Sequence, residues 1–319
     1  MKLKLLHIAS LQPVLPIIQG GMAVEVSTGN LAGNVAKNGA VGVIGASGME
    51  PETLAKEIRV AKEIAEGNGI IAINIMVAAT DFFKLVKVSV KENIDLLIAG
   101  AGFSKDIFKF KKEYNIPFVP IVSAPRLAKI SVALGADAII VEGKEAGGHL
   151  GTNLPMKNIL KEVMKEVKGR VPVIGAGGII DGKDVCEVLN MGADGVQMAT
   201  RFVLSEECTV DKKFKEYYLT HSAKDVVVFP SPVGLPGRSI STELVEKAIA
   251  GQWKKKCACE YQCLKVCDRT FCIIKALQRA IKGETKDTII FAGERFSEIK
   301  DILPVKTIID NIVRDINNC

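Results

Sequence analysis

The sequence predicts an α/β fold, a (β/α)8 TIM barrel with a helical C-terminal appendage, and two observations lead to this prediction. Between residues 16 and 200, short runs rich in β-branched residues alternate with longer segments of helical periodicity. The short runs number eight and are apolar throughout, as strands of a parallel sheet buried on both faces are. Eight strand–helix units favour a closed barrel over an open doubly wound sheet.

The expected strands are short, and several end in glycine or another small residue. They cover residues 16–19, 40–44, 70–75, 96–99, 117–122, 138–141, 171–174 and 195–198. The expected helices cover residues 29–38, 51–66, 82–92, 104–114, 124–134, 156–168 and 182–191. We expect Asp181 to cap the last of these helices. Because barrel enzymes keep their sites at the carboxyl ends of the strands, the small residues at this rim mark the expected site.

The chain changes character after Phe202, and we expect it to have three parts. Residues 1–204 would form the barrel, and residues 205–290 a helical, cysteine-rich appendage over its mouth. Residues 291–319 would carry a C-terminal helix that packs on the barrel, since residues 299–317 have an amphipathic period. Prolines and glycines predict a turn-rich loop at residues 230–238.

Composition and charge argue against several classes of function. The formal net charge of +6 is mild for 319 residues, and no basic stripe alternates with aromatic residues, so we expect no nucleic-acid partner. We find no signal peptide and no apolar run of about 18 residues, so we expect no membrane span. Eight cysteines without a secretory signal indicate a cytoplasmic protein, in which metal or redox chemistry is favoured over disulfides.

The loop after the sixth expected strand combines the residue types most typical of a catalytic site. Gly147 and Gly148 precede His149, and the carboxylates Glu142 and Glu145 lie just before them. Glycines let the backbone approach a flat ligand closely, and a histidine beside it can present a donor or a proton. We expect one of the two carboxylates to orient His149. The alternative is an ordinary turn with a helix-capping histidine.

Three further positions indicate a ligand at the same rim. Gly177 and Gly178 follow the seventh expected strand and Thr200 follows the eighth. The loops after these two strands form a phosphate site in many barrels, through backbone N–H groups and a hydroxyl. Plain tight turns are the alternative. Asn74 is an amide in an otherwise apolar strand, and it serves either a hydrogen bond inside the barrel or the polar edge of a ligand.

Five motifs occur in order between residues 14 and 204. They are Gln19-Gly20-Gly21-Met22-Ala23, Asn74-Ile75-Met76, Glu145-Ala146-Gly147-Gly148-His149-Leu150-Gly151, Ala176-Gly177-Gly178-Ile179 and Gln197-Met198-Ala199-Thr200-Arg201-Phe202. Together they resemble the nitronate monooxygenase (2-nitropropane dioxygenase) family of FMN flavoproteins. The same family contains the type II enoyl-acyl carrier protein reductases. The resemblance implies an FMN-binding barrel with His149 as the catalytic residue. The cofactor-binding residues that it implies are Gly21, Met22, Ala23, Asn74, Glu142, Gly147, Gly148, Gly177, Gly178, Gln197, Met198, Ala199 and Thr200.

The resemblance leaves the reaction open between two activities. The first expectation is a nitronate monooxygenase that oxidises alkyl nitronates, because residues 232–238 and the tail look more like that branch. The alternative is an NAD(P)H-dependent enoyl-acyl carrier protein reductase acting on enoyl thioesters. An acyl carrier protein is acidic and would need a basic surface, for which Trp253-Lys254-Lys255-Lys256 is the candidate. A flavin-binding electron-transfer or regulatory protein is a further alternative, and the family suggests a homodimer.

A cluster of cysteines falls outside these motifs. Its members are Cys257, Cys259, Cys263, Cys267 and Cys272. On a helix, Cys259, Cys263 and Cys267 would share a face. With one more thiolate they could complete a shell for an iron–sulfur cluster or zinc. The alternative is that the thiols fill a seam between helices as small apolar side chains.

Overall fold

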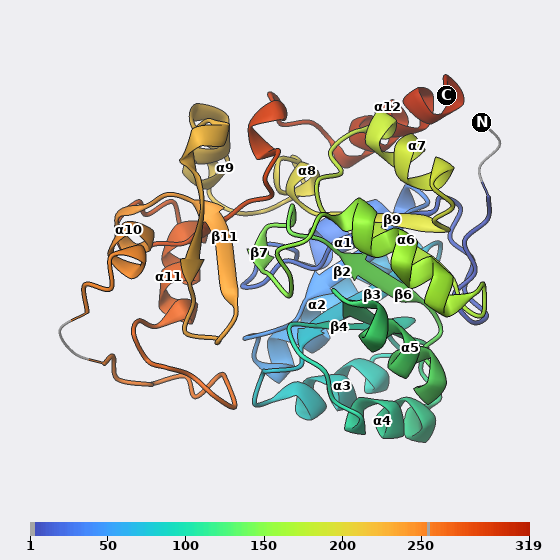
Figure 1. Cartoon of the computed structure of the whole chain (residues 1–319), viewed down its shortest axis with the longest axis horizontal. Helices are drawn as coiled ribbons and strands as arrows, with labels where there is room; N and C mark the ends of the chain where they lie inside the picture. The colour runs from blue at the N-terminus through green and yellow to red at the C-terminus, as the bar shows by residue number, and fades with distance from the viewer. Residues whose placement is uncertain (1–3, 254–255) are drawn as a thin grey trace.

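A closed barrel of eight parallel strands forms the body of the protein, as the sequence predicts (Figure 1). The computed structural model describes residues 4–253 and 256–319. Around the barrel the strands follow one another in the order of the chain. They are β1 (Ile17–Gln19), β2 (Val41–Gly45), β3 (Ile70–Met76), β4 (Leu96–Gly100), β5 (Phe118–Val122), β6 (Ile139–Glu142), β8 (Val173–Ala176) and β9 (Gly195–Met198).

Seven helices connect these strands on the outside of the barrel, and an eighth follows β9. They are α1 (Gly29–Lys37), α2 (Pro51–Ile64), α3 (Phe82–Lys91), α4 (Asp106–Tyr114), α5 (Pro125–Leu134), α6 (Met156–Val167), α7 (Gly182–Asn190) and the short α8 (Thr200–Val203). The predicted cap of α7 is confirmed, since the Asp181 carboxylate accepts a hydrogen bond from the Asp184 backbone N–H at 2.9 Å.

The strands are buried on both faces, which explains their unbroken apolar runs. Successive side chains of a strand point to opposite faces of the sheet. Ile18 and Val43 therefore fill the barrel interior, whereas Ile17 and Ile44 pack in the layer between strands and helices. This arrangement holds the carboxyl ends of the strands, and the loops that follow them, on a rigid frame.

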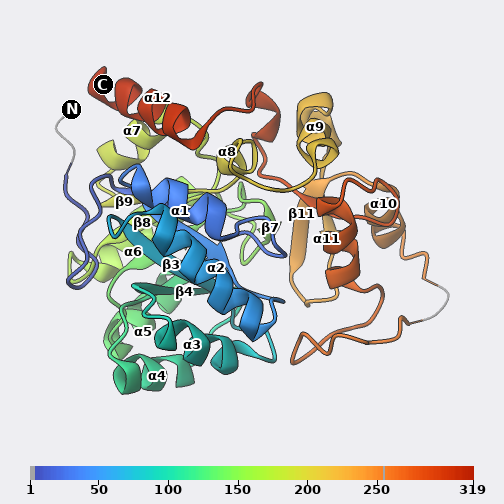
Figure 2. The same ribbon diagram turned by 180° about the vertical axis from the view of Figure 1, so that it is seen from behind.

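The segment after the barrel contains helices and also a β-hairpin, whose turn lies in the loop expected at residues 230–238. Strands β10 and β11 pair antiparallel from Val226↔Ile240 to Pro230↔Pro236, and β11 also pairs with β12 and with β7 of the barrel's sixth loop. In both views this sheet stands between the barrel and helices α10 and α11 (Figure 2). The elements are β7 (Gly148–His149), α9 (Lys212–Thr220), η1 (Ala223–Asp225), β10 (Val226–Pro230), β11 (Pro236–Ile240), α10 (Glu243–Ile249), α11 (Ile273–Ile281), β12 (Ile290–Phe291) and η2 (Phe296–Glu298).

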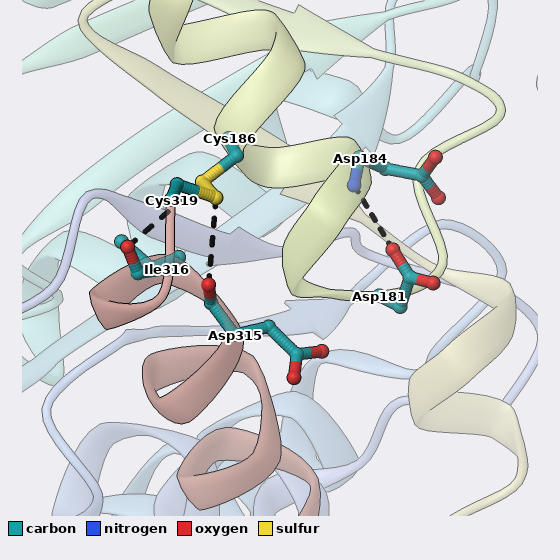
Figure 3. Close-up of a disulfide and its surroundings, with 6 residues drawn as sticks. All are labelled: Asp181, Asp184, Cys186, Asp315, Ile316 and Cys319. Atoms are coloured by element: carbon teal, nitrogen blue, oxygen red, sulfur yellow. Dashed lines mark hydrogen bonds between the residues drawn. A yellow bond between two sulfur atoms is a disulfide. The ribbon is translucent and has the colours of Figure 1, made fainter. Parts of the chain in front are cut away.

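The C-terminal helix α12 (Val305–Asn317) packs against α7 and α1. A disulfide between Cys186 in α7 and Cys319 ties the end of the chain to the barrel (Figure 3). This pair departs from the expectation that the cysteines would avoid disulfides. A bond that closes a long loop restricts the unfolded chain and stabilises the folded one. None of the helices in the described part of the chain is long and apolar enough to cross a bilayer.

Candidate active site

A cavity opens at the carboxyl ends of the barrel strands, and residues of β7, α9, α11 and β12 complete its wall. The structure brings together in its wall nearly all the residues that the sequence motifs predict. These are Gly21, Met22, Ala23, Asn74, Glu142, Gly147, Gly148, His149, Gly177, Gly178, Gln197, Ala199 and Thr200. The cofactor contact expected of Met198 stays a prediction. Its side chain is buried in the layer under the helices, because it points to the opposite face of β9 from its neighbour Gln197.

One end of the cavity is rich in glycine and carries a cation. Gly177 and Gly178 have φ angles of +107° and +72°, a region in which a side chain is strained. The Thr200 hydroxyl accepts a hydrogen bond from Gly293 N–H at 3.1 Å. Arg295, which also lines the cavity, donates to the Gly178 carbonyl at 2.9 Å. Backbone N–H groups, a hydroxyl and a guanidinium together suit an anionic group.

Arg295 was missed by the sequence analysis. It follows the barrel strands by about a hundred residues, and nothing in its own neighbourhood marks it. The carboxylates of Glu298 and Asp184 hold its side chain, with Nη1 2.6 Å from the Asp184 carboxylate. Both contacts raise the pKa of Arg295, with the hydrogen bond to Glu298 contributing most. The guanidinium is therefore a fixed, permanently charged group at this end of the cavity.

The other end of the cavity is built around His149. Its Nε2 atom lies 2.9 Å from the hydroxyl of Ser231, a residue that is 4% exposed. Its backbone pairs with Gly237 of β11, and its ring meets the ring of Phe291 edge to face, with centroids 5.1 Å apart. His149 is thus positioned by residues that come much later in the chain.

We expected Glu142 or Glu145 to form the hydrogen bond that orients His149. The residue that contacts its Nε2 atom is Ser231 instead. The Glu145 carboxylate instead accepts a hydrogen bond from the backbone N–H of Met156 at 2.9 Å, where α6 begins. An acidic side chain is favourable at the first residues of a helix. Its place in the motif therefore reflects how the loop meets α6.

The cavity wall disfavours charge on both of its central titratable groups. Burial lowers the pKa of His149 to about 4 and raises the pKa of Glu142 to about 7. Both side chains keep partial exposure, and both line the cavity. Near neutral pH, His149 is an uncharged imidazole with one donor nitrogen and one acceptor nitrogen.

An unsatisfied amide shows that the cavity is suited to a polar ligand. The side-chain oxygen of Gln197 is buried and has no hydrogen-bond partner in the described structure. Buried acceptors normally have a partner, and the ring N–H or the ribityl hydroxyls of a flavin would supply one. Together with the glycine-rich end near Arg295, this makes the residues present compatible with FMN.

The cysteine cluster lies on an irregular loop between α10 and α11, so the predicted helix that would align three thiols is wrong. All five cysteines are free. Within residues 4–253 and 256–319, no three His, Cys, Asp or Glu side chains already form a metal site. Among the described residues, only Cys263 and Cys272 of the five pack against an apolar cluster. Apolar packing therefore accounts for two of these cysteines and leaves the other three unexplained. Burial, followed by the nearby Cys272, raises the pKa of the Cys263 thiol to about 11.

The fold and the cavity define a barrel enzyme that holds its ligand at the strand ends, and comparison with known proteins identifies its family. The model of the nitronate monooxygenase family matches residues 4–81 and 65–315. The chain therefore belongs to the nitronate monooxygenase family, whose members are flavin-dependent oxidoreductases, and the resemblance inferred from the five motifs is confirmed.

Individual relatives carry different names. One relative is a (3aS,4S,5R,7aS)-5-hydroxy-7a-methyl-1-oxo-octahydro-1H-indene-4-carboxyl-CoA dehydrogenase of Mycobacterium tuberculosis. The two sequences are 32% identical over 237 residues, and this alignment covers 74% of this chain and 66% of that protein. The chain is 26% identical to a probable nitronate monooxygenase of Staphylococcus aureus, over 95% of this chain and 94% of that protein. The structure of FabK from Thermotoga maritima superposes with a TM-score of 0.85 at 31% identity, over 96% of this chain and 94% of that one.

Proposed function

We propose that this protein is an FMN-dependent oxidoreductase that reduces enoyl thioesters with electrons from NAD(P)H. The observation that carries the proposal is the charge state of the cavity. Its histidine is neutral near pH 7, and its carboxyl group also resists ionisation. The part of the cavity around His149 and Glu142 therefore favours an uncharged substrate, because a charge placed between two groups that themselves resist ionisation loses solvation.

The glycine-rich end is the proposed position of the cofactor. Gly177, Gly178 and Thr200 would hold the phosphate of FMN, with Arg295 beside them, and Gln197 would accept a hydrogen bond from the ring or the ribityl chain. Asn74, Glu142 and the segment 21–23 would line the ring. When bound, FMN supplies the hydride-transfer chemistry that no side chain can perform.

His149 is the proposed catalytic residue. Ser231 lies at hydrogen-bond distance from Nε2 and so helps to fix the orientation of the ring. A neutral imidazole held in one orientation can polarise a thioester carbonyl or pass a proton to the substrate. Phe291, together with Leu277, Ile281 and Ile289, gives the cavity an apolar roof that excludes water. The similarity to FabK over nearly the whole chain supports the proposed reduction of enoyl thioesters.

Oxidation of alkyl nitronates is the second candidate, and the description of the family model favours it. A nitronate is an anion, and it would need a positive partner. Arg295 is already engaged by two carboxylates at the glycine-rich end, and a neutral His149 cannot supply the charge. The acyl carrier protein partner and the homodimer stay predictions. Of the basic stretch at residues 253–256, Lys254 and Lys255 lie outside the described residues.

A single experiment separates these candidates. The purified yellow protein is mixed anaerobically with NADH or NADPH, and the flavin absorbance at about 450 nm is followed. We expect rapid bleaching, followed by recovery of the colour when crotonyl-CoA is added. Bleaching by propyl-2-nitronate, with no response to either nicotinamide, would instead establish the nitronate reaction. If neither compound bleaches the flavin, the protein is a flavin-binding electron-transfer or regulatory protein.

A further inference from the structure

We propose that the cysteine loop, residues 256–272, binds an iron–sulfur cluster through four of its five cysteine thiolates. The loop joins α10 to α11 and contains neither a helix nor a strand, apart from one bridge between Leu264 and Ala79. A stretch this long without regular structure is usually either functional or disordered. Here it is folded against the rest of the protein, and its composition indicates what would hold it.

The backbone brings the cysteines at the two ends of the loop together. The Cys257 N–H donates to the Arg269 carbonyl at 2.8 Å, so the first cysteine lies beside the segment that leads to Cys272. Cys263 and Cys272 pack against the same apolar cluster, which includes Phe271. The five cysteines therefore lie on one loop whose two ends meet, although no three of their thiols already form a metal site in the described residues.

Packing and disulfide chemistry leave most of these thiols unexplained. Cys257, Cys259 and Cys267 belong to no apolar cluster, and none of the five is in a disulfide. Four thiolates complete the ligand shell of an iron–sulfur cluster, so the loop carries one thiol more than it needs. Binding would draw the loop closed around the cluster and release the four thiol protons, as is usual where a metal completes the folding of its site.

The charge around the loop suits an anionic cluster. Lys256, Lys265 and Arg269 lie in the loop, and Lys275 follows in the first turn of α11. Glu260 and Asp268 are the acidic residues of the loop, and Glu260 is paired with Lys275 at 2.8 Å. A cluster held by four thiolates carries net negative charge, which this excess of cations would balance.

The position of the loop favours a redox cluster over zinc. Thr80 N–H donates to the Cys263 carbonyl at 3.1 Å, and Asp268 N–H donates to the Pro232 carbonyl at 3.2 Å. Residue 80 follows β3, whose Asn74 and Met76 line the cavity, and Pro232 is next to the serine that binds His149. The loop is thus attached to the wall of the flavin cavity. The choice of iron–sulfur over zinc rests on the proposed flavin chemistry, whereas the thiolate site itself does not.

The test uses the full-length protein, produced with added iron and purified anaerobically. Iron, acid-labile sulfide, zinc and FMN are measured per chain in the same sample. We expect about four iron and four sulfide for a cubane cluster, or about two of each for the smaller form, with an electron paramagnetic resonance signal after reduction by dithionite. Because FMN is counted separately, loss of the cluster is distinguished from failure of the proposed function.

A double substitution tests the ligands, because the loop has one thiol to spare. The Cys263→Ser/Cys272→Ser variant keeps only three loop thiols and should lose most of the iron while keeping FMN, whereas Cys208→Ser, which removes a free cysteine outside the loop, should keep both. Stoichiometric zinc without iron would overturn the assignment to an iron–sulfur cluster. Less than about a tenth of an equivalent of either metal after anaerobic reconstitution with iron and sulfide would overturn the site itself.

Discussion

The two ends of the cavity are built in different ways. At one end, Gly177, Gly178 and Thr200 lie within two residues of the strands β8 and β9 that place them. At the other end, His149 depends on Ser231, which is 82 residues further along the chain. The barrel therefore provides a fixed cradle, while a separate sheet sets the environment of the proposed catalytic residue. A covering sheet can vary between relatives without any change in the barrel, which suits a family with more than one reaction.

The largest effect is expected from a substitution at the His149 end of the cavity. In His149→Ala, we expect turnover to fall by about 100-fold or more, which is the usual effect of losing an acid–base group. FMN should stay bound, because the glycine-rich end is untouched. The measurement is kcat together with the flavin content of the purified variant.

His7 provides the control for this substitution, since it is exposed and distant from the cavity in sequence. His7→Ala should keep full turnover. If His149→Ala turned over at the wild-type rate, or if it lost FMN in proportion to activity, the separation of the two ends would be wrong.

The second prediction concerns the glycine-rich end of the cavity. Gly178→Ala adds a side chain at a position with a φ of +72°, and the new Cβ would lie 3.2 Å from the Cβ of Glu145. The backbone strain is roughly 1–2 kcal/mol, so we expect FMN affinity to fall by about tenfold, as measured by fluorescence titration. The turnover of the fraction that holds FMN should change little.

Gly169→Ala is the matched control for strain. Gly169 has a φ of +69° with nothing within 4 Å of the added Cβ, and it lies just after α6. It should lose stability to a similar degree and bind FMN normally. Equal loss of FMN in both variants would mean that general destabilisation, rather than the cradle, controls binding.

The third prediction concerns the contact between the covering sheet and the catalytic residue. Ser231→Ala removes the partner of His149 Nε2, and a hydrogen bond of this kind contributes about 0.5–1.5 kcal/mol. We expect kcat to fall roughly 3- to 10-fold, with little change in FMN content. Ser239→Ala, which removes a buried hydroxyl of β11 that has no partner in the described structure, should leave kcat unchanged. A similar loss in both variants would indicate damage to the sheet.

The same contrast explains what could be predicted from sequence. The barrel strands can be recognised from their short apolar runs, which alternate with helical segments. Gly177, Gly178 and Thr200 follow these strands directly, so local sequence patterns are enough to predict this end of the cavity. The hairpin was missed because the strand β10 has only one buried residue, Phe229, and β7 and β12 are two residues long. Pairing across distant segments creates these strands.

Three features that the sequence did not indicate have related physical causes. Ser231 is one serine between two prolines, and nothing local shows that its hydroxyl meets a histidine. The cysteines have a four-residue spacing that is compatible with a helix, but the loop follows an irregular path. Its backbone accepts a hydrogen bond from Thr80 N–H and donates to the carbonyls of Ala78 and Pro232. Met198 fits its motif but faces away from the cavity, because alternation along a strand admits only one of two neighbours.

The smallest expected effect is on the pH dependence of stability, where two contributions from inside the cavity oppose each other. Unfolded His149 takes up a proton below about pH 6.5, whereas folded His149 stays neutral down to about pH 4. The folded state therefore loses stability as the pH falls through this window. Unfolded Glu142 ionises above about pH 4.5, whereas folded Glu142 stays neutral up to about pH 7. This contribution is lost as the pH rises, so the two slopes oppose each other between pH 4.5 and 6.5.

Single variants should reveal the hidden slopes, which we expect to amount to about 1–3 kcal/mol across the window, given that both groups keep some contact with solvent. Urea unfolding of the flavin-free protein at pH 5 and pH 6.5 measures them. Glu142→Gln should become more stable as the pH rises, because only the histidine slope remains, whereas His149→Gln should become less stable. The double variant should return to nearly the wild-type profile. If Glu142→Gln kept the wild-type profile, Glu142 would be ionised in the folded protein, and the argument that the cavity favours an uncharged substrate would fail with it.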